Sequence, residues 1–98
     1  MHPHKLLFFK KEGCAPCLNA LDQLKRSLED NPEYEEYIAV LQKEHHKILV
    51  EEYKLEMYPT LICIDEGGKE IGRKVGQKYL DHFFFTRSLN YIHRKRSQ

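Results

Sequence analysis

The sequence has no long hydrophobic run. Near its beginning the apolar stretch "LLFF" (6–9) has four residues, too few for the core of a signal peptide or for a membrane span. We therefore expect neither a targeting segment nor contact with a membrane.

Cysteine is scarce, and the three cysteines are an odd number. A complete set of internal disulfides is thereby excluded, which argues against a secreted scaffold held together by disulfides. We expect a cytoplasmic protein, in a compartment that keeps thiols reduced. There a C-x-x-C pair is typically redox-active or metal-binding.

No charge of one sign dominates, because 16 Lys and Arg stand against 15 Asp and Glu. This balance gives no reason to expect nucleic acid as a partner. The one basic cluster, "HRKRSQ" (93–98), is typical of a helix C-terminus, where cations interact favourably with the helix dipole. With 98 residues, 41% hydrophobic and 32% charged, and no repeat or linker, the chain is predicted to be one domain over residues 1–98.

Hydrophobic periodicity predicts seven elements. In chain order, we expect a strand at 5–9, a helix from 14 to the "DNP" at 30–32, a strand at 36–43, a helix at 46–56, a strand at 60–64, a strand at 70–76 after the turn "DEGGK", and a helix at 78–95. A strand–helix–strand start implies a right-handed parallel crossover, and the later hairpin adds an antiparallel pair. The expected fold class is α/β, with a four-stranded mixed sheet flanked by three helices.

The predicted helices have expected buried faces and ends. The first helix should bury an apolar stripe made of Leu18, Leu21, Leu24 and Leu28. In the last helix, three consecutive phenylalanines at 83–85 cover so broad a sector that at least two should be buried. The second helix should end on the approach to Pro59, since the residue before a proline avoids helical backbone.

The motif "CAPC" (14–17) lies at the start of the first predicted helix. There Cys14 would meet unpaired backbone N–H groups and the positive end of the helix dipole, which lower the pKa of a thiol. Cys17 lies one turn inside the helix, on the same side and deeper, where its sulfur can reach that of Cys14. Pro16 fits the first turn because no N–H bond is lost there. The pair therefore predicts a nucleophile and a resolving thiol that form a reversible disulfide.

Zinc is the alternative use of such a pair, and a structural zinc site needs four ligands. His2 and His4, or His45 and His46, could be recruited, but neither pair has the spacing of a zinc finger. We therefore expect no metal. The third cysteine, Cys63, alternates within an apolar strand and is expected to be a buried, inert thiol.

The order of motifs resembles the thioredoxin family over nearly all of the chain. A strand is followed by C-x-P-C opening a helix, then by "YPT" (58–60) before an apolar strand, and then by a hairpin and "KVG" (74–76). The resemblance implies a thioredoxin-like fold without the first strand and helix with which thioredoxins usually begin. It also implies that Cys14 attacks and Cys17 resolves.

Further site residues follow from the same resemblance. Pro59 would be cis, which would place the backbone of Tyr58 where it can pair with an extended substrate. Gly76 would line the same groove, where the lack of a side chain lets a substrate backbone approach. Ala15 and Pro16, between the two cysteines, would complete the substrate-binding surface.

The chain departs from the thioredoxin pattern at several positions. Gly13 stands where a tryptophan is usual, and Ala15 where a glycine is usual. Family members also bury an acid on the first strand opposite a lysine on the next, and the matching positions here are Phe8 and Val40. The loss of both charges together is consistent, because one buried charge without its partner is costly. We expect both side chains to lie beneath Cys17.

The resemblance implies a thioredoxin-type oxidoreductase that reduces protein disulfides and contributes to redox homeostasis and electron transport. Its partners would be disulfide-containing proteins and an electron donor of the thioredoxin reductase type, with no cofactor, and it would act as a monomer. A glutaredoxin-like, glutathione-dependent reductase is one alternative. Against it, the motif has no tyrosine, and "GGK" (67–69) lacks the acid that glutaredoxins place after their glycine pair. A non-catalytic thioredoxin-fold binding subunit is another alternative.

Overall fold

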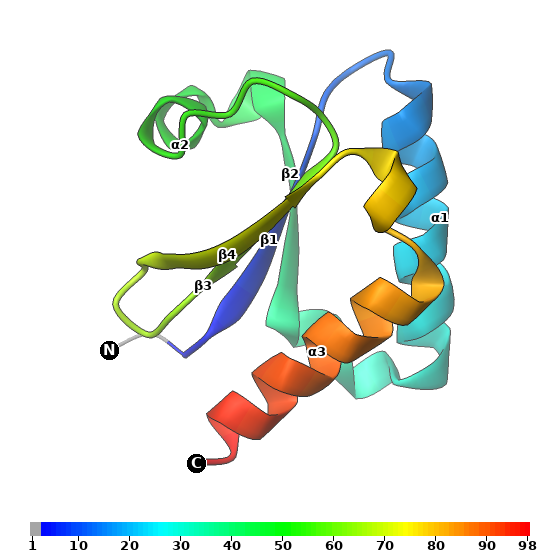
Figure 1. Ribbon diagram of the computed structural model, residues 1–98, viewed down its shortest axis with the longest axis vertical. Helices are drawn as coiled ribbons and strands as arrows, with labels where there is room; N and C mark the ends of the chain where they lie inside the picture. Colours follow the sequence, from blue (N-terminus) through cyan, green and yellow to red (C-terminus); the bar gives the residue numbers. More distant parts are fainter. Residues whose placement is uncertain (1–2) are drawn as a thin grey trace.

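One four-stranded sheet with three α-helices forms the chain, in the order that the sequence predicts (Figure 1). The computed structural model describes residues 3–98, so His2 lies outside the described residues. The elements are β1 (Lys5–Lys10), α1 (Ala15–Asp30), β2 (Ile38–Gln42), α2 (Lys47–Glu52), β3 (Thr60–Ile64), β4 (Glu70–Val75) and α3 (His82–Arg96). The strand order is β2-β1-β3-β4, with β1 and β2 parallel and the other two pairs antiparallel. The predicted α/β class, with a mixed sheet, is confirmed.

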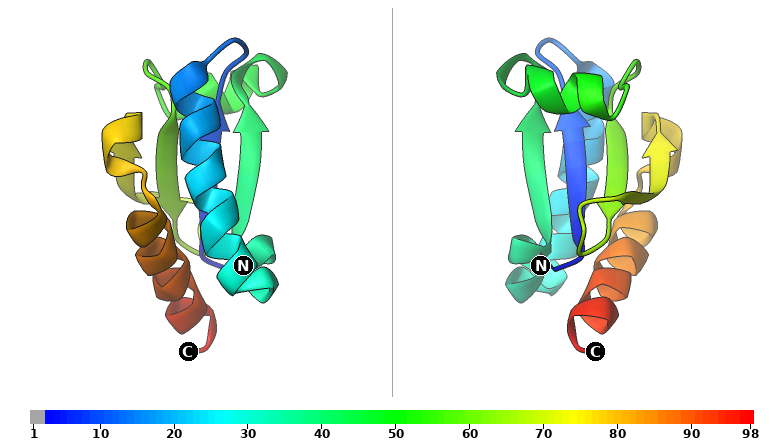
Figure 2. Two further views of the ribbon diagram at one scale, coloured as in Figure 1. Left: turned by 90° about the vertical axis from the view of Figure 1, so that its right-hand side faces the viewer. Right: turned by 90° about the vertical axis from the view of Figure 1, so that its left-hand side faces the viewer.

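Helices cover both faces of the sheet (Figure 2). α1 and α3 lie against one face, and α2 crosses one end of the other. β1 runs through the middle, so Leu6 and Phe8 pack toward α1 and α3, whereas Leu7 and Phe9 pack in the cluster on the α2 side. All four are buried, which explains why β1 reads as a continuous apolar run. Within residues 3–98, no helix is long and apolar enough to cross a membrane.

The second helix is shorter than predicted. α2 ends at Glu52, and the chain then reverses through Lys54, whose φ of +52° lies in the left-handed region. The backbone N–H of Leu55 returns to the carbonyl of Val50, and the Leu55 side chain is buried. The helix therefore ends to bring Leu55 into the core, well before Pro59 exerts any restriction.

The last helix begins later than predicted, because Asp81 caps it. The Asp81 Oδ1 accepts a hydrogen bond from the backbone N–H of Phe84 at 2.9 Å, and residues Gln77–Tyr79 form a separate 3-10 helix. Of the three phenylalanines, Phe85 is completely buried and Phe84 partly, while Phe83 is 74% exposed. The expectation that at least two rings are buried is therefore met by Phe85 in full and by Phe84 in part.

α1 buries most of the predicted stripe: Leu24 is buried, and Leu21 and Leu28 are partly buried against the same core, but Leu18 is 59% exposed. The buried face also includes Cys17, Ala20 and Ser27. The Ser27 Oγ donates to the carbonyl of His82 and lies 2.9 Å from the Thr86 Oγ1. A hydrogen-bonded hydroxyl thus joins α1 to α3 where the leucine pattern alone predicts an aliphatic contact.

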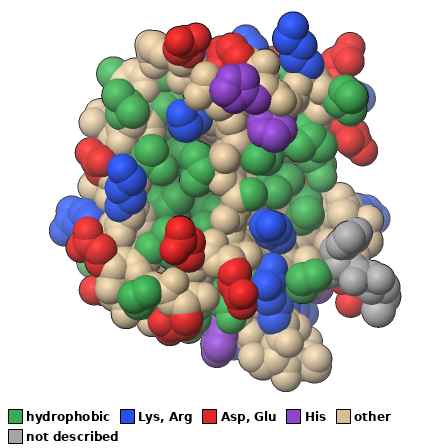
Figure 3. Space-filling model, turned by 180° about the vertical axis from the view of Figure 1, so that it is seen from behind, with side chains coloured by type: hydrophobic (Ala, Val, Ile, Leu, Met, Phe, Trp, Pro, Cys, Tyr) green, Lys and Arg blue, Asp and Glu red, His purple; other side chains and the backbone are tan. Residues whose placement is uncertain are grey.

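β2 is the outer strand of the sheet on one side. It is the most distant strand in Figure 1, so Figure 3 looks onto its edge and shows apolar side chains gathered across the middle of that face. Val40 is 42% exposed there, and Ala39 and Leu41 are half-buried. The strand is short and is followed directly by Lys43, features with which natural proteins limit pairing between free edges.

Candidate active site

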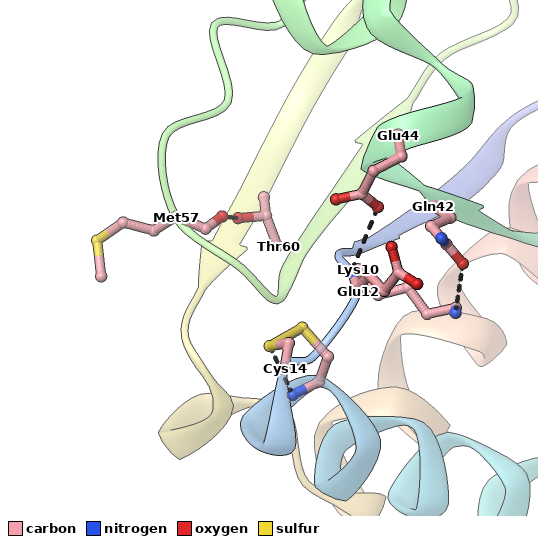
Figure 4. The surroundings of a disulfide bond; sticks show 8 residues. Lys10, Glu12, Cys14, Gln42, Glu44, Met57 and Thr60 are labelled. Carbon is pink, nitrogen blue, oxygen red and sulfur yellow. Dashed lines mark hydrogen bonds between the residues drawn. A yellow bond between two sulfur atoms is a disulfide. The ribbon is translucent and has the colours of Figure 1, made fainter.

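Three segments that are far apart in sequence meet at one end of the sheet. β3 is antiparallel to β1, with Phe9 opposite Thr60, so the loop after β1 and the loop before β3 share this end. β4 is antiparallel to β3, with Val75 opposite Thr60, which brings Gly76 to the same end. The cysteine motif, Tyr58–Pro59 and Gly76 therefore lie at one end of the sheet, as the resemblance implies. Figure 4 shows Cys14 and Thr60 near each other at this end.

Cys14 and Cys17 are joined by a disulfide, with their Cα atoms 5.2 Å apart. The predicted intramolecular disulfide is confirmed. Cys14 is the N-cap of α1, and its Sγ accepts a hydrogen bond from the backbone N–H of Cys17 at 3.2 Å. Such a donor, together with the helix N-terminus, stabilises a thiolate on Cys14 once the disulfide is reduced.

The two cysteines differ in access to solvent. Cys14 is 7% exposed and Cys17 is 1% exposed, so Cys14 is the more accessible of the two. Ala15 and Pro16 are exposed beside them, and Pro16 lies in the first turn of α1, as predicted. The arrangement can accept two electrons at a disulfide whose outer sulfur, on Cys14, is slightly accessible and whose inner sulfur, on Cys17, is almost fully shielded.

The Tyr58–Pro59 peptide bond is cis, as the resemblance implies, and Pro59 is fully buried. The backbone N–H of Gly76 donates to the carbonyl of Pro59 at 2.8 Å, which ties the end of β4 to this loop. Gly76 has a φ of +95°, and a Cβ placed on it would meet open space. Glycine is therefore required at this position by backbone conformation.

The Tyr58 side chain turns away from the disulfide toward the cluster on the α2 side. Its Oη is buried without a hydrogen-bond partner in the described part of the chain, and the Lys43 Nζ lies 5.5 Å from the ring centroid. Burial, followed by the negative charge of Glu44, raises the pKa of Tyr58. The predicted contribution of Tyr58 to substrate binding thus rests on its backbone.

Thr60 is a site residue whose contacts the sequence motif does not reveal. Its side chain is buried, and its Oγ1 donates to the carbonyl of Met57 at 2.6 Å, which closes the loop at 57–60. Figure 4 shows the Met57 side chain pointing away from this loop, and it is 63% exposed. The "YPT" motif includes Thr60, but only the fold shows that its hydroxyl holds the loop.

A second pair of contacts fixes the loop before Cys14. The Glu44 Oε1 accepts from the backbone N–H of Glu12 at 3.2 Å, and the Lys10 Nζ donates to the Gln42 Oε1 at the same distance. Desolvation raises the pKa of Glu44, but hydrogen bonds from the backbone N–H groups of Glu44 and Glu12 outweigh it and the net pKa is lowered. Glu44 is 32 residues from Glu12, so no local pattern in the sequence indicates this contact.

Phe8 and Val40 are opposite each other on β1 and β2, as the resemblance implies. Phe8 is completely buried on the α1 side and packs edge-on against Phe85, with ring centroids 5.9 Å apart. Val40 is 42% exposed at the sheet edge. The expectation that both lie buried beneath Cys17 is therefore wrong for Val40, because β2 has no outer neighbour within residues 3–98.

Cys63 is separate from this site. It pairs with Leu6, three positions from the Phe9–Thr60 pair at the active-site end. It is half-buried, so the expectation of a buried thiol needs correction. Burial, with the charge of Asp65 adding to it, raises the pKa of the Cys63 thiol to about 11. No three His, Cys, Asp or Glu side chains cluster for a metal among the residues that the structure describes.

Alkylation of the reduced protein should therefore distinguish the three thiols. At pH 6 we expect iodoacetamide to modify Cys14 first. Cys14 lies at the helix N-terminus, which favours its thiolate, and it is more exposed than Cys17. Cys63 should stay slow at pH 8, and its rate should rise about tenfold per pH unit toward pH 11, since only the thiolate reacts. Peptide mass mapping gives the rates, and the unfolded protein is the control. Equal labelling of Cys14 and Cys63 would contradict the assignment.

No family model matches the chain, and no curated protein matches it by sequence. Solved structures do. The chain is similar to a thioredoxin of Fasciola hepatica, with a TM-score of 0.68 and 22% identity over 95% of this chain and 81% of that one. It is similar to the thioredoxin pre-protein of Schistosoma mansoni, with a TM-score of 0.69 and 18% identity over 96% of this chain and 80% of that one. It is also similar to mitochondrial thioredoxin 3 of Saccharomyces cerevisiae, with a TM-score of 0.66 and 14% identity over 93% of this chain and 80% of that one.

The chain spans 81% and 80% of the lengths of the first two of these thioredoxins. The sheet order, the disulfide at the start of α1 and the cis proline before β3 all agree with the likeness. The chain therefore has the thioredoxin fold, with a C-x-P-C disulfide at the N-terminus of its first helix.

Proposed function

We propose that the protein is a thiol–disulfide oxidoreductase that reduces disulfides in other proteins. The observation that carries the proposal is the position of the Cys14–Cys17 disulfide: its outer sulfur caps α1 and its inner sulfur is shielded. This is the arrangement that a two-step exchange needs, with one accessible low-pKa thiol and one protected partner within reach.

In the reducing direction, the Cys14 thiolate attacks a substrate disulfide. A mixed disulfide forms between Cys14 and one substrate sulfur, and the other leaves as a thiolate that takes up a proton. The Cys17 thiolate then attacks the Cys14 sulfur and expels the second substrate thiol. The substrate has gained two electrons, and the Cys14–Cys17 disulfide has formed. A dithiol donor of the thioredoxin reductase type would restore the reduced pair.

The surface around the disulfide fits an extended, partly apolar substrate segment. Gly76 presents backbone without a side chain, and Met57, Leu18 and Tyr79 are all largely exposed within a few residues of the site. Lys78 lies over the Tyr79 ring, with its Nζ 5.7 Å from the ring centroid. We therefore expect a preference for substrate segments that combine apolar and acidic residues around the cystine. The protein would act as a monomer in the cytoplasm, without a cofactor.

A glutaredoxin-like activity would need a glutathione site next to Cys14. The glycine pair of this chain, Gly67–Gly68, lies instead in the turn between β3 and β4, at the opposite end of the sheet. Asp65 Oδ1 accepts from the backbone N–H groups of Gly67 and Lys69 and so organises a tight hairpin. This placement favours protein disulfides over glutathione as the substrate.

Trapping tests the proposal directly. The Cys17→Ser variant should accumulate mixed disulfides between Cys14 and target proteins, because the second step is blocked, and thiol reduction should release them. The Cys14→Ser/Cys17→Ser double variant is the matched control and should trap nothing. If both variants trap equally, Cys14 is not the attacking thiol, and if the double variant keeps full biological activity, the protein is a binding subunit; either result contradicts the proposal.

Two coupled assays then separate the reductase classes. Protein-disulfide reduction is measured with NADPH and thioredoxin reductase, and separately with glutathione and glutathione reductase. We expect turnover in the first system. Turnover confined to the second would identify a glutaredoxin-like enzyme.

A further inference from the structure

A groove lies between β4 and α3, on the face of the sheet that α1 and α3 cover. It has a volume of about 470 Å³. Leu6 and Cys63 form its floor, and Ile71, Phe84 and Tyr91 form its walls. A smaller cavity of about 220 Å³ shares Leu6, Cys63 and Phe84 with it and extends it along β4. The larger volume is within the range of roughly 300–1,000 Å³ found for small-molecule pockets.

The groove is distinct from the disulfide site. Leu6 and Cys63 are opposite each other near one end of β1 and β3, whereas Phe9 and Thr60 pair at the end where Cys14 lies. Ile71 lies at the β-bulge beside Cys63 and lines the wall of the groove. Its side chain is 45% exposed there. An apolar side chain is thus held at the mouth of the groove.

Two cations lie beside the Phe84 ring, which lines both cavities. Arg87 lines the larger cavity, with its Cζ 5.8 Å from the ring centroid, and Lys74 lines the smaller one, with its Nζ 6.0 Å from the centroid. Neither has a carboxylate partner in the described part of the chain, in contrast to Arg73, which is paired with Glu70. Ser88 adds a hydroxyl to the lining of both cavities. An apolar floor is therefore bordered by two uncompensated positive charges.

We propose that this groove binds a free anionic amphiphile, an unbranched aliphatic carboxylate. Its hydrocarbon chain would cover Leu6 and Ile71, and its carboxylate would be held by Arg87 and Lys74. The assignment follows from charge complementarity, because an anion supplies the partner that both cations lack. Each methylene removed from water adds favourable free energy, so affinity increases with chain length. The inference is independent of the proposed redox function.

Decanoate is the probe, titrated into the oxidised protein and followed by calorimetry and by amide NMR shifts. We expect saturable 1:1 binding, with shifts centred on β4 and α3. Decanol, which lacks the charge, and decyltrimethylammonium, which reverses it, should bind more weakly. Equal binding of the cation would overturn the proposal, because charge would then play no part. Binding to phosphatidylglycerol vesicles without binding of decanoate would also overturn it, in favour of a lipid surface.

Variants locate the site. Ser88→Leu should fill the groove and weaken decanoate binding at least tenfold, whereas Ser88→Ala, which removes the hydroxyl without filling the groove, should weaken it much less. Arg87→Gln, at an exposed position, should weaken binding about tenfold through the lost charged hydrogen bond. If Ser88→Leu does not fold, Arg87→Gln decides. Unchanged affinity in the folded variants would overturn the proposal.

The Cys63 thiol offers a readout inside the groove. Bound decanoate should slow alkylation of Cys63 at pH 9 severalfold and leave that of Cys14 unchanged in the reduced protein. Ser88→Leu should abolish this protection. Decanoate binding by the Cys14→Ser/Cys17→Ser variant should equal that of the wild type, so that failure of the redox proposal and failure of this one are separate results. Equal labelling of Cys63 with and without decanoate would contradict the site.

Discussion

The Cys14→Ser variant is expected to lose disulfide exchange completely, whereas the Cys63→Ala variant should keep turnover within about threefold of the wild type. Cys14 carries the outer sulfur of the disulfide, and no other thiol among residues 3–98 reaches the same surface. Serine keeps the size of the side chain but forms neither a thiolate at neutral pH nor a disulfide. Cys63 is half-buried at the other end of β3, where a smaller side chain alters packing but not the chemistry.

The measurement is turnover with a protein disulfide as substrate and dithiothreitol as reductant. Circular dichroism of each variant shows that the fold is intact. Cys17→Ser is assayed in the pre-reduced form without dithiothreitol, where it should complete one half-reaction and stop with one substrate sulfur bound per molecule. Residual turnover of Cys14→Ser above the background rate would assign the nucleophile elsewhere. A large loss in a folded Cys63→Ala variant would make Cys63 a resolving or regulatory thiol.

Local patterns in the sequence predict much of the fold. β3 has the predicted bounds, and the order of strands and helices is as predicted, because short apolar runs and changes of period are strong signals. The position of Cys14 at the start of α1 also follows from local rules, since Pro16 favours the first helical turn. These features depend on neighbouring residues alone.

Contacts between distant residues are the part that the sequence does not reveal. The hydroxyl of Ser27 joins α1 to α3, 55 residues away, and Leu18 of the predicted stripe is exposed. The Glu44 carboxylate holds the loop before Cys14 across 32 residues. A periodic pattern identifies an apolar stripe, but which side faces the core depends on what the partner element offers.

Val40 shows the same limit within the sheet. Its apolar neighbours in "IAVL" (38–41) predict burial, yet β2 is an outer strand and half of its surroundings are solvent. Strand order is a property of the whole chain, so the exposure of Val40 could not be read from its own segment. Phe8 and Val40 are paired in register but differ in burial. A charged side chain should therefore be tolerated at Val40 and not at Phe8.

Replacing Phe8 by aspartate should therefore produce the largest loss of stability. Phe8 is completely buried between the sheet and Phe85, and no cation lies among the residues that form this cluster. Loss of the ring alone costs about 3–5 kcal/mol. The carboxylate adds a further cost of about 2–4 kcal/mol near pH 7, because it is buried without a partner. Phe8→Asn is the matched control, since it has nearly the same shape without the charge.

The pH dependence separates the two costs. In the Phe8→Asp variant, burial raises the pKa of the introduced carboxyl in the folded state above its unfolded value of about 3.9. Between these two values the folded state binds more protons, so its stability falls as pH rises, and the added cost is fully relieved only below the unfolded pKa. Urea unfolding from pH 3.5 to 8, in sucrose to keep both variants folded, should show Phe8→Asp approaching Phe8→Asn at the acidic end.

Val40 provides the second control. Val40→Lys alone should change stability by less than about 0.5 kcal/mol, because the side chain can reach solvent at the sheet edge. Combined with Phe8→Asp it should recover part of the loss near neutral pH, since Val40 is the register partner of Phe8 on the same face. If Phe8→Asp and Phe8→Asn are equally stable at pH 7, water reaches the carboxylate, and the site beside α1 is not the dry, apolar layer that the packing of Phe8 against Phe85 indicates.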